Sequence, residues 1–258
     1  MARVFITGSA DGLGLMAGRL LAEQGHEVVL HARNQARADE ARAALPSASG
    51  VVAGDLSTVA AMRDVAEQAN ALGRFDAVVH NVGIGHRQAP DRVETADGLC
   101  RLWAVNVLAP YVLTALMERP GRLVYLTSGL HLGGDPSLRD VQWSQRAWVN
   151  HQAYSDSKLH DIWLAFSVAR LWPDVRSNAV SPGWVATRMG GPAATDDLSQ
   201  GPVTQAWLAV SDDPAALETG RYLYHQRPAQ EHPAARDTGR QDRLLAYCAE
   251  VSGAQLKP

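Results

Sequence analysis

A tyrosine and a lysine four residues apart, Tyr154 and Lys158, form the most reactive pairing in the sequence. In a helix this spacing places both side chains on one face, about one turn apart. An ammonium held near a phenol favours the phenolate and lowers the pKa of the tyrosine from its usual value of about 10. Such a tyrosine can donate or accept a proton near neutral pH. The alternative is an amphipathic surface pair with no chemical role.

The scarcity of lysine favours the chemical role. Of the 24 basic residues only two are lysines, Lys158 and the penultimate Lys257, and all the others are arginines. A planar guanidinium cannot replace a compact ammonium that must donate several rotatable hydrogen bonds from one point. We infer that position 158 requires an amine.

A glycine-rich turn follows the expected first strand, Arg3–Thr7, and precedes an apolar helical pattern that begins at Leu15. The order of strand, glycine turn and helix is what a dinucleotide-binding fingerprint requires. Gly8 permits a tight turn and Gly12 lets backbone N–H groups approach a pyrophosphate at the helix N-terminus. Gly14 permits close packing of helix against strand. A glycine turn between two core elements, without a ligand, is the alternative.

The second expected strand, Glu27–His31, ends at Ala32-Arg33-Asn34, near the point where dinucleotide folds place an acidic residue on the ribose 2′-hydroxyl. Arg33 stands there instead. A guanidinium binds a 2′-phosphate in a fork, whereas a carboxylate repels it. We therefore expect NADP(H) as cofactor and NAD(H) as the less favoured one, although Asp11 adds negative charge nearby. Arg33 could also solvate a loop or stack on adenine.

The remaining chain alternates short buried strands with helical segments of about a dozen residues, with further strands expected at 50–56, 75–81, 121–128, 175–180 and 220–224. This alternation predicts one α/β domain, residues 1–258, with a doubly wound parallel sheet of about seven strands and helices on both faces. Asp55, at a strand end, could contact an adenine amino group or cap the next helix. Asn106, in the middle of a long helical pattern at 96–117, could hold a water or bend the helix.

Two segments are expected on the substrate side of the domain. An insertion, residues 129–150, carries Trp143 and Trp148, which either line a substrate pocket or, as we favour, pin the insertion to the domain. A segment rich in glycine and alanine, residues 184–200, is expected to be a mobile lid. No histidine has partners at metal-ligand spacing, so no metal site is expected.

Taken in order, these motifs resemble the short-chain dehydrogenase/reductase family, in its short, non-extended form, over nearly the whole chain. Thr7–Gly14 has the family's glycine spacing, and His80-Asn81-Val82-Gly83 is similar to its Asn-Asn-Ala-Gly motif with two positions changed. The resemblance implies a Rossmann-type fold and a catalytic set made of Ser128, Tyr154, Lys158 and Asn106. It implies cofactor contacts from Gly8, Ser9, Asp11, Gly12, Leu13, Gly14, Arg33, Asp55, Leu56, Asn81, Gly83, Tyr154, Lys158, Pro182, Gly183, Val185 and Thr187.

The long step between the serine and the tyrosine is similar to that of bacterial relatives of retinol dehydrogenases and protochlorophyllide reductases. The resemblance implies an NADP(H)-dependent oxidoreductase that interconverts a ketone or aldehyde with an alcohol, as a homodimer or homotetramer. The tryptophans of the insertion, with Trp184, suggest a fairly large apolar or aromatic substrate. One alternative is a catalytically silent NADP-sensing regulatory protein with the same fold. A sugar-nucleotide epimerase or dehydratase is disfavoured by the turn spacing.

The overall composition excludes several other classes. A net charge of −3 and a pI near 6.3 offer no basic stripe for nucleic acid or for an acidic membrane surface. No signal peptide and no run of 18 apolar residues are present, and Cys100 and Cys248 are expected as free thiols of a reducing compartment. We therefore expect a cytoplasmic protein without a membrane span.

Overall fold

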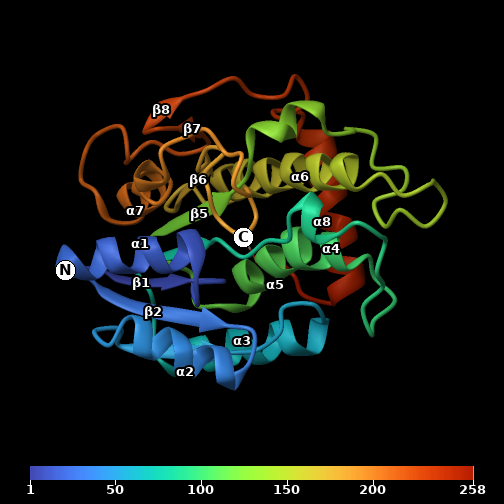
Figure 1. Cartoon of the computed structure of the whole chain (residues 1–258). Helices are drawn as coiled ribbons and strands as arrows, with labels where there is room; N and C mark the ends of the chain where they lie inside the picture. The colour runs from blue at the N-terminus through green and yellow to red at the C-terminus, as the bar shows by residue number, and fades with distance from the viewer. Residues whose placement is uncertain (258) are drawn as a thin grey trace.

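An eight-stranded sheet with helices on both faces forms the protein (Figure 1), as seen in a computed structural model that describes residues 1–257. The strand order is β3-β2-β1-β4-β5-β6-β7-β8, and all neighbours are parallel except β7 and β8. The bounds are β1 Arg3–Ile6, β2 Glu27–Ala32, β3 Gly50–Ala53, β4 Ala77–His80, β5 Arg122–Leu126, β6 Arg176–Ser181, β7 Tyr222–Tyr224 and β8 Arg227–Pro228. The predicted doubly wound parallel fold is confirmed.

The sequence predicted about seven strands, and the strand that it did not predict is β8. This strand pairs with β7 across the two-residue turn His225–Gln226, in which both residues have positive φ, 47° and 62°. Tight hairpin turns of this kind normally use asparagine and glycine, which tolerate positive φ. Because histidine and glutamine occupy the turn, the sequence carries no hairpin signal at this point.

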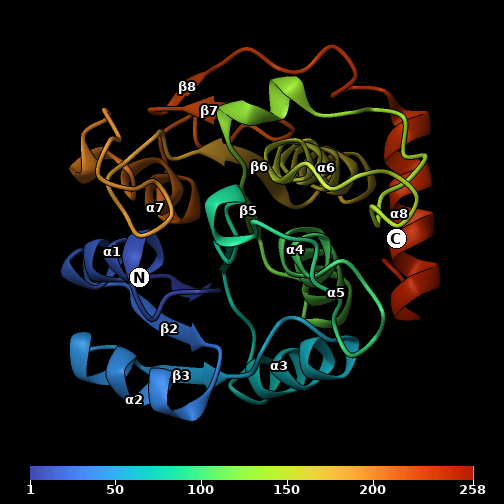
Figure 2. The same cartoon turned by 45° about the vertical axis from the view of Figure 1, so that its right-hand side comes forward.

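The helices divide between the two faces of the sheet. The bounds are α1 Gly12–Glu23, α2 Gln35–Ala44, α3 Val59–Ala71, α4 Arg101–Trp103, α5 Ala109–Leu116, α6 Asn150–Leu171, α7 Val203–Val210 and α8 Thr238–Ser252. Figure 2 shows α1, α2 and α7 on one side of the sheet and α3, α5 and α6 on the other, with α8 outside them. None of the helices in residues 1–257 is long and apolar enough to cross a membrane.

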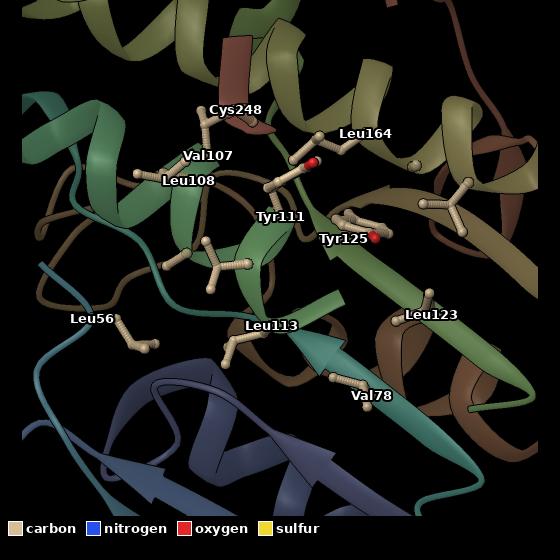
Figure 3. Close-up of a cluster of buried hydrophobic side chains, with 14 of the residues drawn as sticks. Leu56, Val78, Val107, Leu108, Tyr111, Leu113, Leu123, Tyr125, Leu164 and Cys248 are labelled. Carbon is tan, nitrogen blue, oxygen red and sulfur yellow. The ribbon is translucent and has the colours of Figure 1, made fainter. Parts of the chain in front are cut away.

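Alternating side chains of the strands supply the two apolar layers. Val4 and Ile6 of β1 pack in the cluster shared with α1 and α7, whereas Phe5 packs in the cluster shared with α3, α5 and α6. This two-residue period follows from the pleat of a strand. Figure 3 shows part of the second cluster, where Leu123 of β5 and Leu113 of α5 belong to the same buried layer.

The segment expected to be helical from 96 to 117 begins later and is not regular. Residues 95–99 form a tight turn, in which Thr95 N donates to Leu99 O at 2.8 Å and Gly98 has a φ of +75°. The helix then runs through α4, a π-helical turn at Ala104–Leu108, and α5. Pro110, the second residue of α5, directly follows the π-helical turn and, having no N–H, cannot donate a hydrogen bond back into it.

Helix α6 is the central helix of its layer, and every residue from Ala153 to Val168 is buried. It contacts β5 and β6 on the sheet side, and α8 packs against it from outside. A helix enclosed in this way cannot leave polar side chains to water, so each polar residue on it needs a partner inside the protein.

The second apolar cluster should dominate stability. Truncation of Leu123, which is 1% exposed, to alanine should cost about 2–5 kcal/mol of unfolding free energy, because it leaves a cavity under α5 and α6. The control Leu132→Ala, at a position 41% exposed, should change stability by less than about 0.5 kcal/mol. Urea denaturation followed by circular dichroism measures both, and equal losses would contradict this assignment of the core.

Candidate active site

The crevice of the site is set by the sheet topology. The chain builds β1, β2 and β3 in one direction and then crosses back, so that β4 pairs with the other side of β1. At such a switch point the loops leaving the two central strands diverge and open a crevice at the carboxyl edge of the sheet. The glycine turn leaves β1 here, and Asn81 leaves β4.

Side-chain hydrogen bonds hold the ends of β1 and β4 together. Asn81 donates from Nδ2 to the carbonyl oxygens of Thr7 and Gly8 at 2.9 and 3.0 Å. Thr7 Oγ1 in turn accepts from the backbone N–H groups of Asn81 and Val82 at 3.0 and 3.1 Å. Gly14 packs directly on this junction, since a Cβ there would lie 2.5 Å from Asn81 Nδ2 and 2.6 Å from Gly8 O. The close helix–strand approach expected at Gly14 is therefore present.

A histidine that sequence reasoning treated only as part of a strand also holds the turn. His31 Nδ1 accepts from Gly8 N at 3.0 Å, and Nε2 lies 3.0 Å from Gly54 O. Burial lowers the pKa of His31 to about 4, so the ring is neutral and donates from Nε2. His31 thereby ties the glycine turn to the end of β3. A polar residue inside an otherwise apolar strand was the one available signal.

The N-terminus of α1 fits the phosphates of a dinucleotide. Gly12 has a φ of +54°, and a Cβ built there meets no atom within 4 Å, so the backbone borders open space. Asp11 occupies the N-cap position, but its side chain makes no capping hydrogen bond, and no acidic residue lies in the first turn. First-turn N–H groups with no side-chain cap and the positive end of a helix dipole attract an anion. Ser9 contributes no free hydroxyl, because its Oγ donates to Ile6 O and accepts from His31 N.

Asp11, in the glycine turn, lies beside two arginines. Asp11 is bound by Arg37 at 2.6 Å and lies 3.9 Å from Arg188, so its charge is balanced within the protein. Arg33 follows β2 and is exposed. The negative charge of Asp11 therefore argues less strongly against a 2′-phosphate nearby, since two guanidiniums offset it.

Asp55 and Leu56, in the loop after β3, lie in different environments. Asp55 is exposed and accepts from Ser57 N at 3.0 Å, while the side chain of Thr58 caps α3 by accepting from Ala61 N. The alternative that Asp55 caps this helix is therefore wrong. Leu56 is 3% exposed and belongs to the core, and its contact with a cofactor stays a prediction.

Tyr154 and Lys158 lie together on α6, as their spacing predicts. Lys158 Nζ lies 5.6 Å from the centroid of the Tyr154 ring and donates to Leu126 O, at the end of β5, at 2.9 Å. The Ser128 side chain, just beyond β5, lies close enough to the Tyr154 hydroxyl to lower its pKa, and its Oγ accepts from Leu130 N at 3.3 Å. The phenol, the amine and the serine hydroxyl therefore converge beside the crevice.

The balance of charge at Tyr154 differs from the sequence expectation. Burial raises the pKa of Tyr154, and this outweighs the lowering by Lys158 and by the Ser128 side chain. We expected Lys158 to bring the pKa below about 10, but that argument ignored the cost of burying a phenolate. The phenol is therefore protonated at neutral pH in the structure.

Asn106 lies in the π-helical turn and connects α6 to the loop after β4. Its Oδ1 accepts from Ile84 N at 2.7 Å, and its Nδ2 donates to Ile84 O and Ser157 Oγ at 3.1 and 3.0 Å. Ser157 donates in turn to Tyr154 O at 2.7 Å. Gly83 borders both groups, since a Cβ there would lie 3.6 Å from Asn106 Oδ1 and 3.7 Å from Lys158 Nζ.

The tryptophans of the insertion pack inside it. Trp143 is 5% exposed, and the guanidinium of Arg146 stacks 3.5 Å above its ring. Arg146 also binds Asp156 of α6 at 2.7 Å, and Trp148 donates from Nε1 to Ala89 O at 3.2 Å. These contacts attach residues 129–150 to the domain.

The segment 184–200 lies over the reactive tyrosine. Met189 Sδ is 3.9 Å from the Tyr154 hydroxyl, and a Cβ at Gly85 would lie 2.5 Å from Met189 Cγ. Trp184 is 47% exposed and donates from Nε1 to Gly190 O. Sequence reasoning missed Met189, which is the side chain of this segment that contacts Tyr154.

The base of the segment 184–200 is formed by the loop after β6. Gly183 has a φ of +87° and, with Pro182, is half-buried, while Val185 is buried and pairs with Asp196. Thr187 Oγ1 accepts from Gly190 N. Leu13 is covered by the end of the segment, because a Cβ at Gly201 would lie 2.6 Å from its Cδ2.

A family model described as enoyl-(acyl carrier protein) reductase matches residues 8–211. The chain belongs to the short-chain dehydrogenase/reductase family. Enzymes of this family are oxidoreductases that bind a nicotinamide cofactor and act on small molecules.

Relatives within the short-chain dehydrogenase/reductase family cover the whole chain. An uncharacterized oxidoreductase of Emericella nidulans, AN7799, is 44% identical over 98% of this chain and 98% of its own. A protein of Streptomyces sp. strain C5, named provisionally as the daunorubicin C-13 ketoreductase DnrU, is 30% identical over 98% of this chain and 92% of its own.

Solved structures of short-chain dehydrogenase/reductase proteins and others share the fold. An uncharacterized protein of Mycobacterium paratuberculosis covers 100% of this chain and 96% of its own with a TM-score of 0.85 at 24% identity. A blue fluorescent protein from a metagenomic library, in complex with NADPH, covers 86% of this chain and 95% of its own with a TM-score of 0.68 at 22% identity.

Because Gly14 packs closely on the junction between the glycine turn and β4, we expect a methyl group added at this position to lower stability. Gly14→Ala should cost about 1–3 kcal/mol of unfolding free energy, because the new Cβ meets backbone and the Asn81 amide at less than 3 Å. Gly133→Ala, where a Cβ meets no atom within 4 Å, is the control and should change stability by less than about 0.5 kcal/mol. Thermal denaturation without cofactor measures both, and a Gly14→Ala variant as stable as the control would contradict the close packing.

Proposed function

We propose that the protein is an NADP(H)-dependent reductase that converts a ketone or aldehyde to an alcohol, with Tyr154 as the acid. The observation that carries the proposal is the convergence of the Tyr154 phenol, the Lys158 amine and the Ser128 hydroxyl beside the crevice. These groups supply a proton, a fixed positive charge and a hydrogen-bond donor at one point. Carbonyl reduction requires this set when a hydride arrives from the opposite side.

The chain's residues each have a part in this mechanism. The nicotinamide, when bound, supplies the hydride that attacks the carbonyl carbon. Tyr154 donates its hydroxyl proton to the carbonyl oxygen, and Ser128 donates a hydrogen bond to the same oxygen as negative charge develops. Lys158 lowers the cost of the phenolate that Tyr154 becomes and has an N–H left for a ribose hydroxyl. Asn106 holds the loop after β4 in register with α6, and we propose that it also positions a water next to Lys158.

The protonated form of Tyr154 is the form that the proposed carbonyl reduction uses. A proton donor must carry its proton before the reaction, and burial keeps the pKa of Tyr154 above its ordinary value. The phenol is then available as an acid at neutral pH. Oxidation of an alcohol would need the phenolate, which forms only at higher pH.

The arginines near the glycine turn support NADP(H) over NAD(H). The exposed Arg33 follows β2 without a neighbouring carboxylate in the strand end, and Arg37 with Arg188 balances Asp11. A 2′-phosphate placed beside Arg33 would meet a guanidinium and no uncompensated anion. The structural neighbour solved with NADPH is consistent with this choice.

The substrate class is best described as a ketone. One relative is named for the reduction of a ketone at C-13 of daunorubicin, which supports a fairly large substrate. The tryptophans of the insertion no longer support an apolar pocket, because Trp143 and Trp148 are used in packing. The exposed ring of Trp184 and the side chain of Met189 are the apolar groups that we place beside the carbonyl.

A catalytically silent regulator is not favoured. Burying Lys158 next to Tyr154 is costly for stability, and a protein that only senses NADP(H) does not need it. A cytoplasmic location and a homodimer or homotetramer remain predictions. Any contact between subunits through α6 would have to avoid α8, which covers that helix.

The acid role of Tyr154 predicts a sharp loss on removal of one oxygen. Tyr154→Phe should lower turnover by about 10²–10⁴-fold, because in the proposed mechanism only Tyr154 transfers a proton to the carbonyl oxygen, while NADPH affinity stays nearly unchanged. Tyr111→Phe, which removes a buried hydroxyl bonded to Ala254 O, is the matched control and should retain turnover. NADPH oxidation with a panel of ketones and aldehydes measures activity, and a fully active Tyr154→Phe enzyme excludes the proposed acid.

Cofactor choice predicts a selective effect at Arg33. Arg33→Ala should weaken NADPH binding by roughly ten- to a hundredfold, as expected for a charge-assisted hydrogen bond of about 1.5–3 kcal/mol, and leave NADH binding unchanged. Arg42→Ala, an exposed arginine of α2, is the control and should affect neither cofactor. Fluorescence titration with both cofactors measures the affinities, and equal losses for NADPH and NADH would refute contact with the 2′-phosphate.

A further inference from the structure

A buried carboxylate that the proposed mechanism does not use lies behind the reactive amine. Asp161 is one turn beyond Lys158 on α6, and its Oδ2 accepts a hydrogen bond from Nζ at 2.8 Å. The two side chains are 5% and 3% exposed. The other oxygen, Oδ1, has no hydrogen-bond partner within residues 1–257. The charge of this carboxylate is therefore balanced chiefly by Lys158.

The two acceptors around Nζ determine where its last donor points. An ammonium has three N–H groups at tetrahedral angles. One is bound to Leu126 O at the end of β5 and a second to Asp161, so the third is directed away from both. Gly83, in the loop after β4, borders Nζ, with 3.7 Å between Nζ and a Cβ built at that glycine. The third N–H is thus available to the crevice.

The charges around this pair are coupled. Burial by itself would lower the pKa of Lys158, but attraction to Asp161 and Tyr154 raises it above its ordinary value. Burial raises the pKa of Asp161 to about 6, with Lys158 partly opposing the rise. Asp161 also raises the pKa of Tyr154.

Tyr125 of β5 is the titratable group of the sheet that interacts with Asp161, and the His80 ring of β4 lies 4.7 Å from the Tyr125 ring. Burial raises the pKa of Tyr125 on β5 and lowers the pKa of His80 on β4 to about 3, so both are neutral between pH 5 and 9. On the substrate side, the rings of His86 and His151 lie near Tyr154, with 5.8 Å between the His86 and Tyr154 centroids. Any pH experiment must therefore distinguish the titration of these histidines from that of Asp161.

We propose that Asp161 is a positioning residue that keeps Lys158 charged and aims its free N–H into the crevice, without itself touching substrate or cofactor. The proposal rests on the proposed function, in which Lys158 stabilises the Tyr154 phenolate. A purely structural ion pair is the competing explanation. Buried ion pairs add little stability compared with apolar residues of the same volume, so stability alone gives weak reason for this one.

The pH dependence of turnover distinguishes the two explanations. In the wild type, kcat/KM for carbonyl reduction should fall as the pH drops through about 6, because a protonated Asp161 loses the charge-assisted hydrogen bond that orients the Lys158 ammonium. Asp161→Asn imitates the protonated carboxyl at every pH. It should therefore lose this acid limb and stay at the low plateau, about ten- to a hundredfold below the wild type at pH 8.

Three variants assign the acid limb. Asp161→Glu keeps a carboxylate and should keep the limb, even if its turnover is lower. Asp156→Asn removes another buried, ion-paired aspartate from the same helix, but one that binds Arg146 in the insertion, and should keep the limb. His86→Asn should also keep it. An acid limb that persists in Asp161→Asn, or that disappears in Asp161→Glu or His86→Asn, overturns the proposal.

A measurement without turnover separates this proposal from the proposed function. Because the chain has two lysines, selective labelling with ¹⁵N-lysine gives two side-chain signals, and Lys158→Arg assigns them. The Lys158 ammonium should lose its proton at least about one pH unit lower in Asp161→Asn than in the wild type. An unchanged titration overturns the role of Asp161 even if the enzyme is active. A shifted titration in a protein that reduces no carbonyl supports Asp161 and refutes the proposed function alone.

Discussion

The burial of α6 on all sides is the constraint on which the reactive centre depends. This helix lies between the sheet and α8, so its polar side chains cannot be satisfied by water. An amine in that position loses its hydration and must find acceptors within the protein. Lys158 finds two, the carbonyl at the end of β5 and the carboxylate of Asp161. The position of the amine is therefore fixed by the same packing that makes the core, before any ligand arrives.

The same burial sets the chemistry of Tyr154. A phenol in water would ionise near pH 10, and a neighbouring ammonium would lower that value, but the low dielectric of the interior favours the neutral form more strongly. The result is a tyrosine that holds its proton until a reaction demands it. A proton donor is what the proposed carbonyl reduction needs, so burial keeps Tyr154 in the protonation state that this reaction would use.

The glycine turn after β1 is held in place differently, by hydrogen bonds between loops. Asn81, Thr7 and His31 join the glycine turn to the ends of β4 and β3. None of these side chains is left over for a phosphate. They hold the turn in place and leave the backbone at Gly12 beside open space, where we propose that a dinucleotide binds. Binding to a preformed site loses less conformational entropy than binding to a loop that must be ordered first.

The sequence by itself determined the fold class, the glycine turn between β1 and α1, and the pairing of Tyr154 with Lys158. It could do so because these depend on local patterns: the two-residue period of strands, the glycines that a tight turn needs, and the four-residue step of one helical turn. Only the tertiary structure decided the ionisation of Tyr154, the partner of Lys158 and the place of Met189. Those depend on how deeply α6 is enclosed and on which loops cover it, and burial of this kind results from contacts between segments far apart in the chain. Asp161 illustrates both contributions. Its three-residue spacing from Lys158 can be read from the sequence. Only the enclosure of α6 makes that carboxylate the counter-ion of the amine.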